Sequence, residues 1–180
     1  MRKLTFEEIT NSRICIEELN SKNRIPIYSV LDNIRSMYNV GSIFRTSDAT
    51  RIEKLILCGM TAHPPRKEID KTALGSVDSV PWEYVKDGVE AIKMLKDKGI
   101  KIVVVEQTDE SCDYRDLNVT YPLALVFGHE VTGVSDEIIN LADYAVEIPM
   151  YGVKQSLNVA VAYGIASYYY AHKYLQSNKL

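Results

Sequence analysis

The 180-residue sequence predicts an α/β fold in which a parallel sheet is flanked by helices. Short apolar runs alternate with helical patterns along the chain, and Gly, Pro or polar residues bound each run. The runs at 102–105 and 123–127 contain no polar residue, which is typical of parallel strands buried on both faces. A hydrophobic content of 46% and this length favour one domain with a sizeable core.

The N-terminal residues are expected to lie outside that core. Residues 5–20 predict a helix, with Thr5 and Glu8 spaced as a capping box. Its few apolar positions form a narrow stripe, which suits a helix laid over a domain edge better than a core helix. We therefore expect residues 1–24 to be a helical extension and residues 25–180 to be the domain proper.

The remaining elements follow from hydrophobic spacing and from Gly and Pro breaks. A helix should begin with Asn39 as N-cap and carry Arg45 on its second turn. From periodicity alone, Arg45 is an ordinary exposed helix arginine. The other helices are expected at 71–75, 87–98 and 156–173, and the strands at 27–31, 54–58, 80–84 (an edge strand), 102–105, 123–127 and 144–148.

Glycine and polar residues follow the last two strands. Ligands of parallel α/β sheets bind beyond the carboxyl ends of the strands, so these residues predict a shared small-molecule site. Gly128 and Gly152 would let backbone amides approach a ligand closely. Ser156 and Asn158 add polar groups at the start of the final helix. The simpler interpretation is that Ser156 is only an N-cap and Asn158 an ordinary first-turn residue.

Several site types are excluded by residue type. Residues 128–135 have the spacing of a phosphate loop, but Val134 replaces its lysine and Glu130 places a carboxylate where phosphate would lie. No G-x-G-x-x-G follows a strand, which excludes a Rossmann dinucleotide site. The histidines and the three separated cysteines lack metal-type spacing, so no metal is expected, and a reduced cytoplasmic setting is the simplest interpretation. No run spans a bilayer.

The charge distribution leaves a nucleic-acid partner open. A net charge of −3 argues against one. However, residues 1–66 carry 10 Lys and Arg against 7 Asp and Glu, and they include seven of the eight arginines. Guanidinium groups match phosphate geometry, so the N-terminal third could form a basic face. A solvated surface of mixed charge is equally compatible.

Three segments change the interpretation of this pocket. They are residues 39–46 (NVGSIFRT), residues 126–135 (VFGHEVTGVS) and residues 148–160, where IPMYG runs into SLNVA. In order and spacing they resemble the three signature motifs of the SPOUT class, specifically the TrmH/SpoU family of RNA 2′-O-ribose methyltransferases. The resemblance covers roughly residues 25–174. The family often has Asn and Ser where this chain has His129 and Ala160.

The resemblance implies a C-terminal trefoil knot, S-adenosylmethionine as cofactor and an RNA substrate, with tRNA favoured over rRNA. RNA would be bound through the arginine-rich N-terminal third. Family members usually form homodimers through the C-terminal helix and the first-motif region. That suits the helix at 156–173, which is apolar on most sides and should need a partner subunit to cover it.

The resemblance also implies residue roles. Arg45 matches the catalytic arginine, as general base or, since guanidinium rarely deprotonates, as a group that holds phosphate and stabilises alkoxide. The other expected catalytic residues are Asn39, Glu130, Ser156 and Asn158. The expected cofactor contacts are Val105, Gly128, Ile148, Met150, Ser156 and Leu157.

Two rival functions remain at this stage. One is a catalytically inactive RNA-binding protein with the knotted fold, against which the intact polar set argues. The other is a knotted methyltransferase that acts on a base or a small molecule, which Arg45 disfavours. Binding of S-adenosylmethionine would separate the inactive protein from an enzyme.

Overall fold

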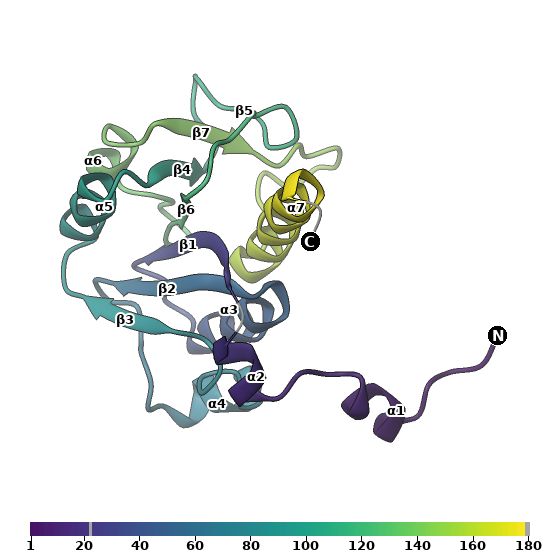
Figure 1. Ribbon diagram of the computed structural model, residues 1–180. Coiled ribbons are helices and arrows are strands. Elements are labelled where there is room, and N and C mark those ends of the chain that lie inside the picture. Colours follow the sequence, from purple (N-terminus) through teal and green to yellow (C-terminus); the bar gives the residue numbers. More distant parts are fainter. Residues whose placement is uncertain (22, 179–180) are drawn as a thin grey trace.

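The computed structural model describes residues 1–21 and 23–178. Within them, seven strands form one sheet in the order β3-β2-β1-β6-β4-β7-β5, and every neighbouring pair is parallel (Figure 1). The prediction of a parallel α/β sheet is therefore confirmed. The strands are β1 (Ile25–Asp32), β2 (Ile52–Cys58), β3 (Trp82–Val85), β4 (Lys101–Val105), β5 (Cys112–Asp113), β6 (Leu123–Phe127) and β7 (Tyr144–Glu147).

Helices cover both faces of the sheet (Figure 1). The helices α3 (Met37–Thr50), α4 (Lys67–Ala73) and α7 (Val159–Asn178) pack together on one side. The helices α5 (Gly88–Asp97) and α6 (Asp136–Ile139) pack against each other on the opposite face. No helix in the described chain is long and apolar enough to cross a membrane.

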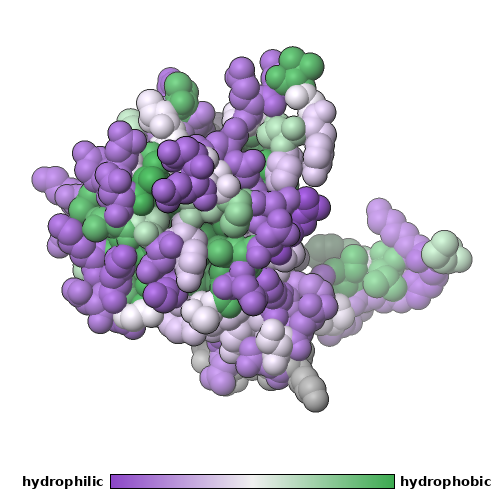
Figure 2. Space-filling view, turned by 90° about the horizontal axis from the view of Figure 1, so that it is seen from above, coloured by the Kyte–Doolittle hydropathy of each residue, from purple (hydrophilic) through white to green (hydrophobic). Residues whose placement is uncertain are grey.

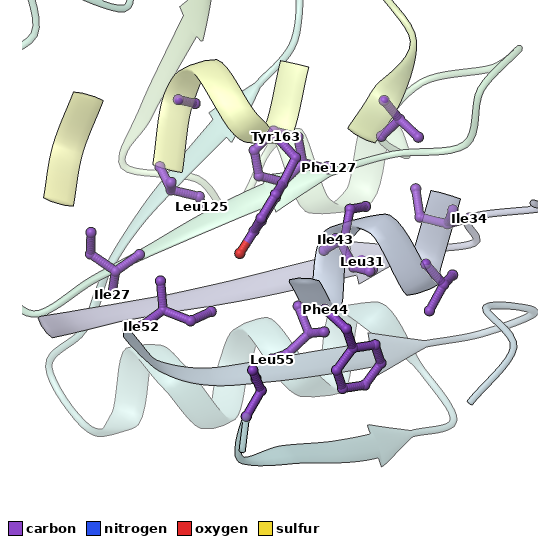
Figure 3. Packing of buried hydrophobic residues seen from close by; sticks show 14 of the residues in the cluster. Ile27, Leu31, Ile34, Ile43, Phe44, Ile52, Leu55, Leu125, Phe127 and Tyr163 are labelled. Carbon is purple, nitrogen blue, oxygen red and sulfur yellow. The ribbon is translucent and has the colours of Figure 1, made fainter. Parts of the chain in front are cut away.

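Two hydrophobic clusters, one on each face of the sheet, hold these layers together. There are two because alternate strand residues point to opposite faces. Ile27 and Leu31 of β1 belong to the cluster beneath α3 and α7, whereas Val30 belongs to the cluster beneath α5. Figure 3 shows Tyr163 of α7 reaching between Phe127 and β1, with its hydroxyl directed into the cluster. That hydroxyl lies 2.6 Å from Ser47 Oγ and 3.2 Å from Ser29 Oγ, so the buried tyrosine is hydrogen-bonded to α3 and β1.

The N-terminal helix differs from the expectation. The capping box of Thr5 and Glu8 is confirmed, but the helix breaks into α1 (Phe6–Asn11) and α2 (Ile16–Ser21). α1 contains no buried residue and projects from the body (Figure 1). Figure 2 shows hydrophobic residues exposed along this segment. Without a surface to pack against, the narrow apolar stripe does not hold one continuous helix. Leu19 of α2 is buried.

Two helix starts were also predicted wrongly. Ser36 caps α3, because its Oγ accepts a hydrogen bond from the Asn39 backbone N–H at 3.3 Å. α7 begins at Val159, and the side chain of Asn158 accepts from the backbone N–H of Ala160 at 2.9 Å. Asn39 is therefore a helical residue and Asn158 a capping residue. The short elements β5 and α6 and the start of α4 at Lys67 were not anticipated either.

The chain between β4 and β6 wraps against α7. The Tyr121 hydroxyl donates to the backbone oxygen of Tyr170 at 2.6 Å, and the Tyr170 hydroxyl donates to that of Tyr114 at 2.9 Å. Lys173 Nζ donates to the oxygen of Leu117 at 2.9 Å. This segment is therefore fixed to the last helix by three hydrogen bonds at Tyr170 and Lys173, which lie within one helical turn.

Candidate functional site

A pocket of about 180 Å³ lies at the carboxyl ends of β4, β6 and β7, beside the start of α7. This is the position that the parallel sheet predicts for a ligand site. Its lining includes all six residues expected to contact the cofactor: Val105, Gly128, Ile148, Met150, Ser156 and Leu157. Gly152, which was expected to approach a ligand, is absent from the lining and lies in the exposed segment 151–158.

The pocket combines apolar walls with carboxylates. Phe127, Val159 and Ala162 extend the apolar wall. Glu106 and Glu147 also line the pocket, and sequence reasoning assigned neither to the site. Each stands at the carboxyl end of a strand, and that position is the signal that could have identified them. Glu147 accepts a hydrogen bond from Ser111 Oγ at 2.6 Å.

One rim of the pocket is a tight loop from Gly128 to Gly133. The backbones of His129 and Gly133 exchange two hydrogen bonds of 3.0 and 2.9 Å. A Cβ added to Gly128 would lie 2.1 Å from the Gly133 carbonyl carbon, so any larger residue would force the loop open. Glu106 supports the loop from below, because its carboxylate accepts from the Val134 N–H at 3.1 Å. Glycine at position 128 is therefore a requirement of loop packing.

A polar cluster joins three distant segments beside this loop. Asn39 of α3 donates through Nδ2 to Glu130 Oε1 at 2.9 Å. Asn158 donates through Nδ2 to Asn39 Oδ1 at 3.1 Å. The partners are separated by 91 and 119 positions in the chain, so only the fold brings them together. The sequence expectation that these three residues share a site agrees with this geometry.

The Glu130 carboxylate accepts hydrogen bonds from three different residues. The backbone N–H groups of Arg35 and Ser36 donate to its two oxygens at 2.9 and 3.0 Å, in addition to Asn39. Burial would raise the pKa of Glu130, but the hydrogen bonds from Arg35, Asn39 and Ser36 outweigh it and lower the pKa. Glu130 is therefore a carboxylate that fixes the loop after β1 to the loop after β6.

Arg45 and Ser156 are placed differently from this cluster. Ser156 lines the pocket, whereas Arg45 is exposed on α3 and is not part of the lining. Arg45 has no hydrogen bond or ion pair with any residue that the structure describes. Within one chain, the structure therefore joins three of the five expected catalytic residues, places Ser156 in the pocket lining and leaves Arg45 on the surface.

No metal-binding arrangement occurs among residues 1–21 and 23–178, because no group of three His, Cys, Asp or Glu side chains is suitably placed.

Fold and pocket together define the class of α/β proteins that bind a small molecule at the carboxyl edge of a parallel sheet. Within it, the chain belongs to the SpoU rRNA Methylase family, because the sequence model of that family matches residues 26–168.

Individual relatives agree with this family. A tRNA (guanosine(18)-2′-O)-methyltransferase from Aquifex aeolicus is 36% identical over 85% of this chain and 72% of its own. The crystal structure of the A. aeolicus TrmH/SpoU tRNA modifying enzyme superposes with a TM-score of 0.78 at 32% identity, over 91% of this chain and 84% of its own.

A third relative has been solved with a cofactor. The SpoU methyltransferase AviRb from Streptomyces viridochromogenes, in complex with AdoMet, has a TM-score of 0.78 at 28% identity and covers 86% of this chain. The present chain spans 63% of AviRb, which is less than two thirds of it.

Proposed function

We propose that the protein transfers a methyl group from S-adenosylmethionine to a ribose 2′-hydroxyl in tRNA. The observation that carries this proposal is the joining of Asn39, Glu130 and Asn158, one from each of the three motifs, beside the pocket. The Aquifex relative is named for this reaction on guanosine 18 of tRNA, so that nucleotide is the first to test.

The pocket suits S-adenosylmethionine by the chemistry of its lining. Apolar side chains such as Val105, Ile148 and Met150 suit a flat adenine. The carboxylates of Glu106 and Glu147 suit the positive charges of the sulfonium and the amino group. We assign cofactor contact to Val105, Gly128, Ile148, Met150, Ser156 and Leu157. The bound cofactor would supply a methyl group that is already activated for attack.

The chain's own groups would position the ribose. Glu130 holds the Asn39 amide in one orientation and Asn39 in turn holds Asn158, so both amides can bind the ribose without reorganisation. Glu130 acts through these amides, because its oxygens already accept three hydrogen bonds. Ser156, which lines the pocket, offers a further hydroxyl. Arg45 would hold the adjacent phosphate and stabilise the developing alkoxide.

Two measurements test this proposal on the full chain. Calorimetry with S-adenosylmethionine should show binding, and a tRNA transcript with guanosine at position 18 should gain a 2′-O-methyl group. Binding without transfer to any tRNA would contradict the proposed substrate. Absence of cofactor binding would contradict the enzyme and favour an RNA-binding protein with this fold.

We also propose that the C-terminal region is knotted, as the resemblance implies. The strand order supports this, because β6 lies between β1 and β4 although it follows β4 in the chain. The contacts of Tyr121, Tyr170 and Lys173 between the preceding segment and α7 also support it. Pulling the unfolded chain from both ends should then give a contour shorter than about 3.3–3.6 Å per residue. A full-length contour would contradict the knot.

We propose a homodimer formed through α3 and α7. Val161 and Tyr168 are 51% and 54% exposed, and their seven-residue spacing places them on one side of α7. Tyr38 and Arg45 share the same spacing on α3 and are also exposed. Light scattering should report twice the mass of the chain, and Tyr168→Glu should reduce the measured mass to that of a single chain. A monomeric wild type would contradict the dimer.

We further propose that residues 1–24 are an extension of a methyltransferase domain at 25–180, supported by the unburied α1 and by the start of β1 at Ile25. A cytoplasmic location is supported by the three cysteines, which are all free in the described chain.

A further inference from the structure

A row of aromatic rings runs from the core to the surface at the β3 edge of the sheet. The buried ring of Phe44 packs edge-on against Trp82, with ring centres 6.3 Å apart. His63, in the loop after β2, stacks on Trp82 at 6.2 Å with an angle of 22° between the rings. Tyr84 then packs on His63 at 4.8 Å. Trp82 and Tyr84 point the same way, since they are two residues apart on a strand.

The outermost ring is both exposed and fixed. Tyr84 is 41% exposed, and its hydroxyl donates to the backbone oxygen of Gly59 at 2.8 Å. The neighbouring Met60 is also exposed, and its backbone N–H donates to Asn33 Oδ1 at 3.0 Å. A fixed aromatic ring with an open face can stack on a flat ligand with little loss of side-chain entropy.

Hydrogen bonds connect this platform to the polar cluster at the pocket. Thr61 fixes the loop after β2 to the loop after β1, because its Oγ1 donates to Leu31 and accepts from the N–H of Ile34. Glu130 fixes the loop after β1 to the pocket rim. β3 lies three strands from β6, which is roughly 15 Å across the sheet. That distance is on the scale of a few nucleotides.

The same edge carries unpaired positive charge although the whole chain is negative. Its exposed cations are Arg35, Arg66, Lys67 and Lys86. None of them forms an ion pair with a residue that the structure describes. The acids in the same segments are Glu68 and Asp70 of α4, and Asp87. Asp87 accepts from the N–H of Val89 at the start of α5. Four cations against three acids favour an anionic ligand here.

We propose that Tyr84 and His63 form a stacking platform for an unpaired base of the substrate RNA, near the nucleotide whose ribose is methylated. This inference rests on the proposed function. Phosphates on either side of the stacked base would lie against Arg66 and Lys86. Aromatic stacking combined with flanking cations is how proteins generally hold single-stranded RNA.

The chain provides its own reporter for this site. Trp82 is the only tryptophan in the sequence and packs within the aromatic row. Titration of the full-length protein with an in-vitro transcribed tRNA should change Trp82 fluorescence, whereas S-adenosylmethionine alone should not. An unchanged Trp82 emission on tRNA binding would overturn the platform.

Substitution tests the platform directly. Tyr84→Ala should weaken binding of the tRNA about tenfold and leave the affinity for S-adenosylmethionine unchanged. Tyr84→Phe keeps the ring and should bind within about threefold of wild type. Tyr144 is the matched control, because it is 40% exposed and stands at the opposite, amino end of β7. Tyr144→Ala should bind tRNA as wild type does.

Equal tRNA affinity of Tyr84→Ala and Tyr144→Ala would overturn the inference, even if the protein methylates tRNA. A wild type that binds neither the cofactor nor tRNA would overturn the proposed function itself. Should Tyr84→Ala fail to fold, Arg66→Gln provides the second test. It should reduce the slope of log affinity against log salt by about one. An unchanged slope would overturn the proposed phosphate contact.

Discussion

The polar cluster at the pocket and the exposed sides of α3 and α7 differ in how many of their side chains have partners within the chain. In the cluster, Glu130 accepts three hydrogen bonds and Asn39 links it to Asn158. On the exposed sides, Arg45 has no partner in the described chain, and Val161 and Tyr168 remain open to solvent. The first region is organised before any ligand arrives, whereas the second offers groups to a partner. Mutations should therefore affect the stability of the folded chain in the first region, and catalysis or assembly in the second.

Arg45→Ala should have the largest effect on activity. Loss of a group that stabilises transition-state charge typically reduces turnover by about a hundredfold or more. Because the Arg45 side chain forms no hydrogen bond or ion pair within the described chain, neither the melting temperature nor the affinity for S-adenosylmethionine should change. Single-turnover methylation and calorimetry measure the two quantities. A variant that keeps most of its activity would show that Arg45 is only an exposed helix arginine.

Gly128→Ala should damage the organised region. The new Cβ would lie 2.1 Å from the Gly133 backbone, so the loop must move at a cost of about 1–3 kcal/mol in unfolding free energy. The affinity of this variant for S-adenosylmethionine should also fall. Gly152→Ala is the matched control, since no atom lies within 4 Å of its added Cβ. Equal denaturation midpoints for the two variants would refute the importance of this close approach.

Glu130→Gln should lower the free energy of unfolding by about 1–2 kcal/mol at neutral pH, because an amide cannot accept all three hydrogen bonds. The folded-state pKa of Glu130 lies below its ordinary value of 4.5. Its contribution is therefore complete above that value and is lost as the pH falls through the folded pKa. Urea unfolding should show the difference between the two proteins shrinking in acid. A difference that grows in acid would contradict the lowered pKa.

Ser36→Ala should have the smallest effect, about 1 kcal/mol in the unfolding free energy, through loss of the cap of α3. Thr5→Ala removes the corresponding cap of α1 and should leave global unfolding unchanged, because α1 buries no residue. Chemical denaturation of both variants compares a cap in the domain with one outside it. An equal loss of stability would mean that α1 packs on the domain.

Much of the fold and of the pocket could be predicted from the sequence, because it depends on patterns of residues that are close together in the chain. The buried strands β4 and β6 follow from unbroken apolar runs, and Gly128 at the pocket follows from its place at a strand end. Ile148 and Met150 were expected there only from the resemblance to the family motifs. Helix starts were harder to predict, because Ser36 and Asn39 are both good capping residues. The side chain of Asn39 bonds to Glu130, 91 positions away, which no local pattern contains.

The sequence by itself therefore determined the parallel α/β class, six of the seven strands that the structure describes and the three motifs, since hydrophobic periodicity and residue type act over a few positions. Only the tertiary structure decided that Asn39 links Asn158 to Glu130, that Glu106 supports the rim, and that Arg45 remains exposed. These outcomes depend on strand order and on hydrogen bonds between loops far apart in the chain. The order in space, with β6 between β1 and β4, differs from the order of synthesis.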